Sequence, residues 1–327
     1  MRAILIDDTQ DHRPLVWGSA PTPQPKPGEA LIRAHASAVN RADLVQRSGK
    51  YPPPPGASHI LGLEIAGVVE RVGEGVDPTL VGQRVCALLT GGGYGEFATV
   101  DAQLLLQLPD DMSFERAAAF PEVFTTAYVN LKIEGQIQAG QRALIHAAAS
   151  GVGTAALQLC RQWGVEAWAT ASGPKLQRCL ELGAHRAIDR HEQSFLDVIR
   201  DHATEGVDMI LDPVGGAYLE DNLKALAKRG RLVLIGLMGG REASLPLGLV
   251  LVKRLQIKGS VLRSRGVEEK REIMARVRKE IWPLYTEGTL DAVIHDTLPI
   301  EQAQQAHELV ASNQTTGKVI LSFGASD

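Results

Sequence analysis

Hydrophobic and polar positions change their pattern after the first third of the chain. In the first third, short apolar runs rich in β-branched residues alternate with clusters of glycine and proline, which predicts a compact, mostly β domain. The runs that predict strands are residues 30–39, 65–72, 84–89 and 96–100. The turn clusters that accompany them are residues 21–28, 51–56, 73–78 and 91–93.

The middle third alternates between strand-like and helix-like segments. Residues 142–147 predict a strand, and residues 151–163 predict a helix because their apolar side chains recur at helical spacing. Further strands are expected at residues 165–169, 207–211 and 231–235, and further helices at residues 174–182, 194–202 and 218–227. Repeated β-α-β order builds a parallel sheet with helices on both faces, so this part predicts a doubly wound domain. The tail is mixed, with helices expected at residues 268–285 and 300–311 and strands at 292–298 and 318–323.

Composition and charge narrow the function classes. With 327 residues, 44% apolar and 22% charged, the chain is neither disordered, nor a coiled coil, nor a collagen-like repeat. At about 150 residues per domain, the length predicts about two domains. The net charge of −4 and the aromatic content of 5% argue against a nucleic-acid partner.

The cysteines, the N-terminal segment and one long uncharged run indicate where in the cell the protein is expected. Cys86, Cys160 and Cys179 have no C-x-x-C spacing, so they predict neither a disulfide framework nor a zinc cluster, and reduced thiols fit a cytoplasmic protein. The N-terminus becomes acidic too early for a signal peptide. The uncharged run over residues 143–160 reads as a strand, a turn and a helix rather than as a membrane span.

The turn between the first strand and the first helix of the middle third is the strongest candidate for binding chemistry. A helix N-terminus with small residues attracts the pyrophosphate of a dinucleotide, because backbone N–H groups and the helix dipole favour an anion. The residues expected to hold it are Ser150, Gly151, Val152 and Gly153. Ala148 and Ser150 replace the first two glycines of G-x-G-x-x-G, so the motif alone is weak, and its strand-turn-helix context carries the prediction.

The end of the second strand of this domain predicts which nicotinamide is bound. An NAD site places an acid there, but residues 168–175 contain none. Ser172, Lys175 and Arg190 are positioned instead to donate to a 2′-phosphate, which favours NADPH. The alternative is that Lys175 and Arg190 are solvated surface charges.

Eight segments spread over the chain carry a resemblance to a known family. They are residues 40–43, 51–56, 60–64, 91–93, 146–153, 211–216, 236–240 and 262–265. With them the sequence resembles the zinc-free medium-chain dehydrogenases/reductases, in particular the quinone oxidoreductase (zeta-crystallin-like) family and its tumour-suppressor-inducible branch.

The resemblance implies an α/β protein in which a Rossmann doubly wound parallel sheet is joined to a GroES-like, mostly β domain. The GroES-like domain would take residues 1–120, completed by 264–327, and the Rossmann domain would take residues 121–263, with the active site in a cleft between them. It also implies a homodimer that joins Rossmann sheets edge to edge. The apolar stretch 245–262 fits such an edge, and a buried internal strand would look the same.

The implied chemistry is hydride transfer from NADPH to a quinone without a metal. Asn40 and Leu63 stand where zinc-dependent relatives place ligands, and neither side chain is a good zinc ligand. Tyr51 and Asn40 become the candidate donors to the oxyanion of the reduced quinone. The alternatives are that Tyr51 only packs in the proline loop and that Asn40 caps a turn.

The same resemblance extends the list of expected cofactor contacts. Gly236, Leu237 and Met238 follow a Rossmann strand, where the nicotinamide ring should lie, although Met238 could equally fill the core. The other expected contacts are Thr126, Leu262, Ser264 and Lys318.

Two other functions remain open from the sequence. Reduction of an activated C=C bond, as in enoyl or alkenal reductases on the same scaffold, also passes a hydride to a conjugated acceptor. A nucleotide- or RNA-binding crystallin-like protein without turnover is the alternative of another class, and the acidic charge balance counts against RNA.

Overall fold

The computed structural model describes residues 1–324 and divides the chain into two compact units. Unit 1 comprises Met1–Thr125 and Arg263–Asp327, and unit 2 comprises Thr126–Leu262. The division falls five residues after the predicted first boundary and one residue before the second. Residues 325–327, which end the span predicted to complete the first domain, lie outside the described residues.

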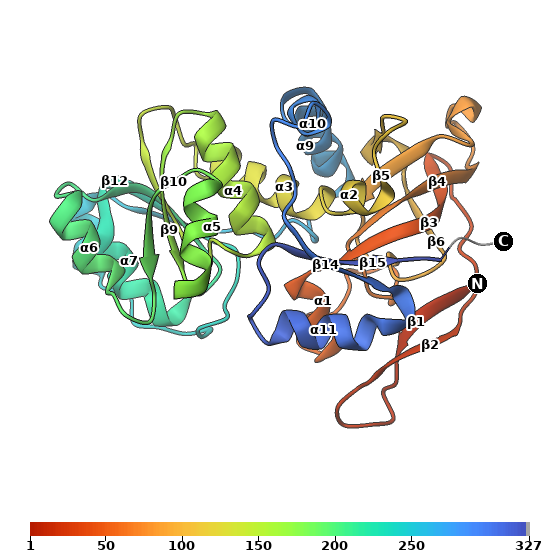
Figure 1. The fold of residues 1–327 in the computed structure, drawn as a ribbon, viewed down its shortest axis with the longest axis horizontal. Coiled ribbons are helices and arrows are strands. Elements are labelled where there is room, and N and C mark those ends of the chain that lie inside the picture. Colours follow the sequence, from red (N-terminus) through yellow and green to blue (C-terminus); the bar gives the residue numbers. More distant parts are fainter. Residues whose placement is uncertain (325–327) are drawn as a thin grey trace. The chain divides into compact units, whose positions relative to one another are not determined.

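Unit 1 is built on a mostly antiparallel sheet in the order β14-β15-β3-β4-β5-β7, with β6 also pairing with β3 and a separate β1-β2 hairpin. The N-terminal strands are β1 (Arg2–Ile6), β2 (Leu15–Ser19), β3 (Glu29–Val39), β4 (Glu64–Val72), β5 (Arg84–Leu88), β6 (Phe97–Asp101) and β7 (Leu105–Gln107). The C-terminal strands are β14 (Ile294–Pro299) and β15 (Lys318–Ser322). Val319 of β15 faces Val39 of β3, so the two ends of the chain share one sheet, as the blue and red strands of Figure 1 show.

The helices of unit 1 pack on this sheet and on one another. They are α1 (Arg41–Arg47), α2 (Phe114–Ala118), α9 (Val267–Glu280), α10 (Trp282–Thr286) and α11 (Ala303–Ala311), and α3 (Pro121–Tyr128) crosses the boundary between the units. Ala303 and Ala306 of α11 lie in a core cluster with Val319 and Leu321 of β15. The single helix predicted over residues 268–285 is wrong, because Pro283 has no N–H to continue the ladder and a new helix starts at Trp282.

Unit 2 is a six-stranded parallel sheet in the order β10-β9-β8-β11-β12-β13. Its strands are β8 (Arg142–Ile145), β9 (Glu166–Ala171), β10 (Ala184–Asp189), β11 (Val207–Asp212), β12 (Leu226–Leu234) and β13 (Gln256–Gly259). Counted along the chain this is the order 3-2-1-4-5-6 of the Rossmann fold, so the predicted fold class is confirmed.

Helices cover both faces of the unit 2 sheet, as Figure 1 shows for α4 and α5 on one side and α6 and α7 on the other. They are α4 (Gly151–Gln162), α5 (Leu176–Glu181), α6 (Phe195–His202), α7 (Leu219–Ala225) and α8 (Leu247–Lys253). Leu144 and Ile210 from the sheet pack in one cluster with Phe195 and Ile199 of α6 and Leu223 of α7. The adjacent residues of the same strands point to the other face of the sheet and are equally buried. Burial on both faces explains the continuous apolar runs of these strands.

Some predicted boundaries in unit 2 are wrong for identifiable reasons. The helix expected over residues 218–227 ends at Ala225, because Leu226 is already paired with Val207 of the neighbouring strand. The stretch 245–262 contains the helix α8 and then β13, which is one of the two edge strands of the sheet, so of the two interpretations the sheet edge is confirmed and the buried internal strand is not.

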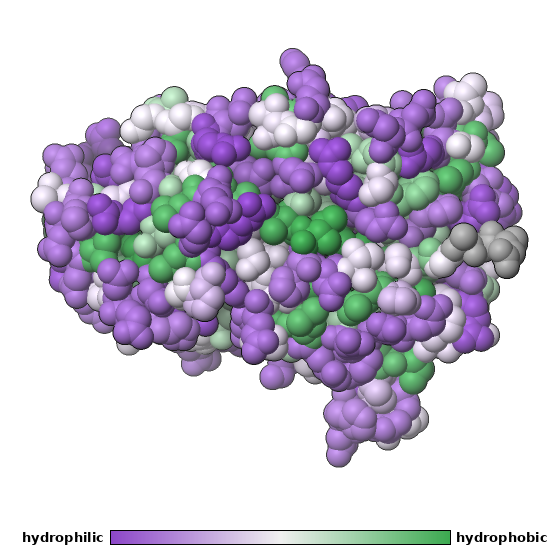
Figure 2. Space-filling model, viewed as in Figure 1, coloured by the Kyte–Doolittle hydropathy of each residue, from purple (hydrophilic) through white to green (hydrophobic). Residues whose placement is uncertain are grey.

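The surface in Figure 2 is mainly polar, with apolar side chains in small groups. Within residues 1–324, no helix combines the length and the apolar character that crossing a membrane requires.

Candidate active site

The turn after β8 in unit 2 has the geometry of a phosphate-binding turn. The chain leaves the strand through Ala147, whose φ of +48° is left-handed, and α4 begins at Gly151. Ser150 caps the helix, because its Oγ accepts a hydrogen bond from Gly153 N at 3.1 Å. A Cβ on Gly153 would lie 2.6 Å from the Ala147 oxygen and 2.5 Å from the Ala148 oxygen, so only glycine lets the helix lie this close to the turn. The cap and first turn of α4 are therefore formed by Ser150, Gly151, Val152 and Gly153. This N-terminus of the helix lies at the carboxyl edge of the sheet.

A buried polar network supports this edge, and sequence reasoning did not assign it a role. Thr170 Oγ1 lies 2.9 Å from His146 Nδ1, and Asn222 Oδ1 lies 2.7 Å from His146 Nε2. Asn222 Nδ2 donates in turn to Asp212 Oδ2 at 2.9 Å, which leaves Asn222 Oδ1 to accept from His146. Burial lowers the pKa of His146 to about 4, so the ring is neutral near pH 7. The network ties the carboxyl ends of β8, β9 and β11 to α7.

The loops after β11 and β12 are joined by backbone hydrogen bonds. Met238 N donates to the Pro213 oxygen at 3.2 Å, and Gly239 N donates to the Val214 oxygen at 2.7 Å. A Cβ on Gly236 would lie 2.8 Å from the Pro213 oxygen, so this close approach requires glycine. Leu237 and Met238 are 49% and 53% exposed, so Met238 does not fill the core.

The end of β9 carries the donors predicted for a 2′-phosphate. Ser172 caps a 3₁₀ turn (Gly173–Lys175), and its carbonyl accepts from Lys175 N at 2.9 Å. Partial burial lowers the pKa of Lys175, and the positive charge of Arg190 lowers it further, so the two cations lie within electrostatic reach of each other. Arg190 is exposed and its N donates to Ala171 at the end of β9. The carboxylate of Asp189 also lies at this turn, since one of its oxygens is 2.6 Å from where a Cβ on Gly173 would be. The sequence pattern did not predict an acid here.

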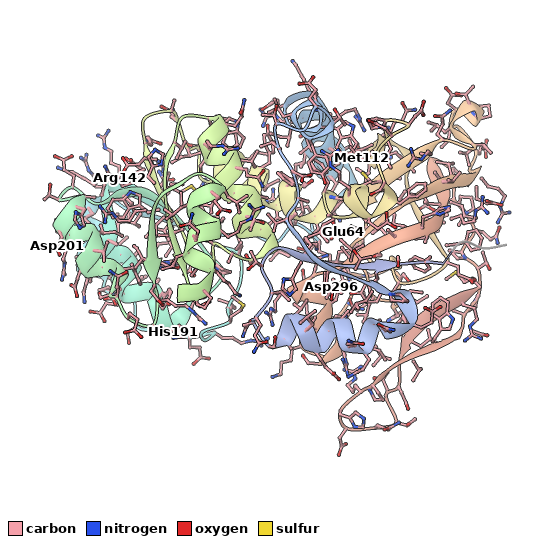
Figure 3. The ribbon with its side chains drawn as sticks, in the orientation of Figure 1. Glu64, Met112, Arg142, His191, Asp201 and Asp296 are labelled. Atoms are coloured by element: carbon pink, nitrogen blue, oxygen red, sulfur yellow. The ribbon has the colours of Figure 1, made fainter. Side chains whose placement is uncertain are left out.

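Asn40 and Lys318 of unit 1 belong to a buried ion cluster around Glu64, which Figure 3 labels. Lys318 Nζ donates to Glu64 Oε1 at 2.7 Å, to Asn40 Oδ1 at 2.6 Å and to the Val39 oxygen at 3.0 Å. Asn40 Nδ2 donates to Glu64 Oε1 at 2.8 Å and to the Ala38 oxygen at 3.3 Å.

These contacts bear on two expectations. All three Lys318 N–H donors are used inside unit 1, where they join β15 to the ends of β3 and β4, and contact with a cofactor stays a prediction. Asn40 stands at the N-cap of α1, and its backbone N donates to Asp43 Oδ2 at 2.8 Å. Its side-chain amide donates to Glu64 and to the Ala38 oxygen, so Asn40 caps α1, and a role as donor to a substrate stays a prediction.

Tyr51 is half-buried and faces a cation that the sequence analysis missed. The guanidinium carbon of Arg263 lies 5.2 Å from the centre of the Tyr51 ring. Burial raises the pKa of Tyr51, while Arg263 acts in the opposite sense and Glu122 adds to the rise. The hydroxyl is therefore protonated at neutral pH and available as a donor. Burial, followed by the charge of Glu64, raises the pKa of Glu122 to about 8.

The remaining predicted cofactor residues lie at the unit boundaries. The Thr126 oxygen accepts from Asn130 Nδ2 at 2.8 Å, one turn further along the chain. Leu262, the last residue of unit 2, is buried, whereas Ser264 in unit 1 is exposed.

The positions that resemble zinc ligands do not fit a zinc ion. Leu63 is a buried alkyl side chain, and both polar atoms of the Asn40 side chain are bonded to Glu64 and Lys318. In the part of the chain that the structure describes, no three His, Cys, Asp or Glu side chains gather in a way that could hold a metal. Metal independence stays a prediction.

The fold and the site define a dehydrogenase or reductase in which a Rossmann unit accompanies a GroES-like unit. Residues 26–110 match the model of the alcohol dehydrogenase GroES-like domain, and residues 151–279 match that of the zinc-binding dehydrogenases. Quinone oxidoreductase from Sus scrofa is 34% identical over 303 residues, which are 91% of this chain and 90% of the relative. The chain belongs to the quinone oxidoreductase family of the medium-chain dehydrogenases/reductases.

Solved structures agree with this assignment. Escherichia coli quinone oxidoreductase, complexed with NADPH, is 28% identical with a TM-score of 0.87, covering 98% of this chain and 99% of that one. The CurK enoyl reductase is 28% identical with a TM-score of 0.86 over the same shares of the two chains.

Proposed function

We propose that the protein is an NADPH-dependent quinone oxidoreductase that passes a hydride from the nicotinamide to a quinone without a metal ion. The observation that carries the proposal is the likeness, over nine-tenths of both chains, to an enzyme named quinone oxidoreductase. The carboxyl edge of unit 2 and the Tyr51 loop of unit 1 supply the chemistry that this reaction requires.

The residues of unit 2 fit NADPH. The close approach at Gly153 and the Ser150 cap hold the turn tightly against the α4 N-terminus, where a pyrophosphate would bind. Ser172, Lys175 and Arg190 would hold the 2′-phosphate, because Lys175 and Arg190 lie within electrostatic reach of each other and a phosphate accepts charge-assisted hydrogen bonds from such cations. Gly236, Leu237 and Met238, with Thr126 and Leu262, would contact the nicotinamide end. When bound, NADPH supplies the hydride.

Tyr51 carries the acid chemistry of unit 1. A quinone accepts a hydride readily, so the protein needs to orient it and to stabilise the oxyanion that forms. The protonated Tyr51 hydroxyl donates to that oxygen. Asn40 helps to hold the buried Glu64–Lys318 pair, and Ser264 follows Arg263 in the same unit.

Assembly and location complete the proposal. A homodimer is supported by α8, where Leu247, Leu251 and Val252 are 69%, 77% and 71% exposed next to the edge strand β13. A cytoplasmic location is supported by three buried thiols that are all free. The net charge of −4 supports small-molecule rather than nucleic-acid partners.

The second candidate is an NADPH-dependent enoyl or alkenal reductase, favoured by the likeness to the CurK enoyl reductase. A steady-state screen of the purified protein with NADPH separates the two, using ortho-quinones, para-quinones and enals as acceptors. We expect kcat/KM to be highest for quinones, to fall in Tyr51→Phe and to be unchanged after dialysis against a chelator. Faster turnover of enals would transfer the assignment to the second candidate, and no turnover of any acceptor would refute both.

A further inference from the structure

Arg263 has an unusual environment for a buried arginine. Its side chain is 4% exposed, and Nε donates to the Thr90 oxygen at 2.8 Å. Its backbone oxygen accepts from Lys270 Nζ at 2.7 Å, so both the main chain and the start of the guanidinium are fixed. The terminal nitrogens Nη1 and Nη2 have no hydrogen-bond partner among the described residues. Buried polar groups are almost always paired, so two unpaired N–H₂ groups point to a ligand.

The unpaired end of Arg263 lies beside Tyr51. The guanidinium carbon is 5.2 Å from the ring centre, and a cation over a ring is attracted without using its N–H donors. The donors of Arg263 and the hydroxyl of Tyr51 therefore remain available to one acceptor oxygen.

The carboxyl groups near Arg263 do not neutralise its positive charge. Glu122 and Asp43 are the carboxyls that act on it, and Lys270 is a second cation near Glu122. Burial raises the pKa of Glu122 to about 8, which keeps that group protonated near pH 7. Asp43 is already bonded to Asn40 N at 2.8 Å and to Gly62 N at 3.1 Å.

We propose that Arg263 is a catalytic residue whose terminal N–H groups, together with the Tyr51 hydroxyl, bind the acceptor oxygen on which negative charge develops. The inference rests on the proposed function and deepens it. It gives the reduction a fixed cation within the protein itself.

The electron and proton balance of the step is complete. The acceptor gains two electrons and one proton as a hydride, and NADPH is oxidised to NADP⁺. The C4–H bond of the dihydronicotinamide breaks, and its hydrogen ends in an O–H bond at one carbonyl oxygen of the quinone. Both C=O π bonds are lost as the ring becomes aromatic, and the electron pair on the other oxygen is the oxyanion that Arg263 stabilises. The Tyr51 O–H bond then breaks, its proton forms the new O–H bond of the product, and solvent returns a proton to Tyr51. A preorganised donor of this kind contributes about 10²–10³-fold to kcat in other enzymes.

The test compares Arg263→Gln with Arg263→Lys, and uses Arg276→Gln, an exposed arginine of α9, as the control. The acceptors are quinones whose hydroquinones differ in acidity, at saturating NADPH. We expect kcat to fall about 100-fold in Arg263→Gln and less in Arg263→Lys, with the larger losses for the more basic product anions. The Kd of NADPH, measured by fluorescence, should stay within about twofold. An equal loss for every acceptor, or no loss, would overturn the proposal.

A binding experiment gives a readout that does not depend on turnover. 4-Nitrophenol serves as an oxyanion probe, since its phenolate absorbs at a different wavelength from the phenol. We expect bound 4-nitrophenol to ionise at a pH about one unit lower in the wild type than in Arg263→Lys, which is about a tenfold change in its ionisation constant. An identical ionisation in both proteins refutes the role of Arg263. If bound 4-nitrophenol ionises at a lower pH but the protein reduces no acceptor, the proposed function is refuted and the oxyanion site is retained.

Discussion

Replacing Lys318 by methionine removes one charge from the buried ion pair of unit 1 and keeps the length of the side chain. Lys318 Nζ lies 2.7 Å from Glu64 Oε1, and the two side chains are 3% and 0% exposed. At that separation the attraction is about 6 kcal/mol for an effective dielectric constant of 20. The desolvation of both ions cancels much of it, so the intact pair contributes little net stability.

The single variant is nevertheless costly, because it leaves the Glu64 carboxylate in the interior without its cation. We expect Lys318→Met to lower the free energy of unfolding by about 3–5 kcal/mol. Urea-induced unfolding of the full chain at pH 7, followed by tryptophan fluorescence, measures the change.

Two further variants decide whether the buried charge is the cause. The double variant Lys318→Met/Glu64→Gln removes both charges, and we expect it to recover most of the loss. Arg178→Met breaks an exposed pair with Glu181, in which the side chains are 47% and 48% exposed, and should cost less than about 1 kcal/mol. The reasoning is refuted if Lys318→Met costs no more than Arg178→Met, or if removal of the Glu64 charge recovers nothing.

Three other expectations concern unit 2. Lys175→Ala and Arg190→Ala should each lower the ratio of kcat/KM for NADPH over NADH about tenfold in steady-state assays, because a charge-assisted hydrogen bond to phosphate is worth about 1.5–3 kcal/mol; an unchanged ratio contradicts the assignment. Gly153→Ala should raise the calorimetric Kd of NADPH at least about tenfold, since its Cβ meets backbone oxygens at 2.5 and 2.6 Å, whereas Gly248→Ala, with no atom within 4 Å, should leave the Kd unchanged. Because burial lowers the pKa of His146 to about 4, the unfolded state binds more protons below about pH 6.5, and stability should fall by up to about 3 kcal/mol as the pH drops from 6.5 to 4. Urea midpoints over this range should be flatter for His146→Gln, and equal slopes for both proteins would contradict the buried neutral ring.

The sequence predicts unit 2 well because its elements are set by local periodicity. A buried parallel strand reads as a continuous apolar run, and a covering helix shows an apolar stripe, so strand order follows from the β-α-β succession. The turn at Gly153 is equally local, because the glycine and the capping Ser150 are three residues apart. The apolar pattern fails at Ala225, where pairing between neighbouring strands decides the helix end.

The chemistry of unit 1 depends on contacts that no local pattern encodes. Lys318 meets Glu64 across 254 residues, so the sequence showed a lysine in a strand and not an ion pair. Arg263 meets Tyr51 across a whole inserted unit, and its unpaired donors become visible only once burial is known. His146 was recognised only as part of a motif, because its partners Thr170 and Asn222 come from other elements.

The pairing of β15 with β3 imposes an order on biosynthesis. Every residue of unit 2 leaves the ribosome before Lys318 is translated, so the Rossmann sheet can close while the first sheet still lacks its last strand. Until then the Glu64 carboxylate has no Lys318 to pair with, and the part of β3 that pairs with β15 has no partner strand. Nascent chains halted before Lys318 should therefore be clients of chaperones and proteases even though their nucleotide-binding half is already native.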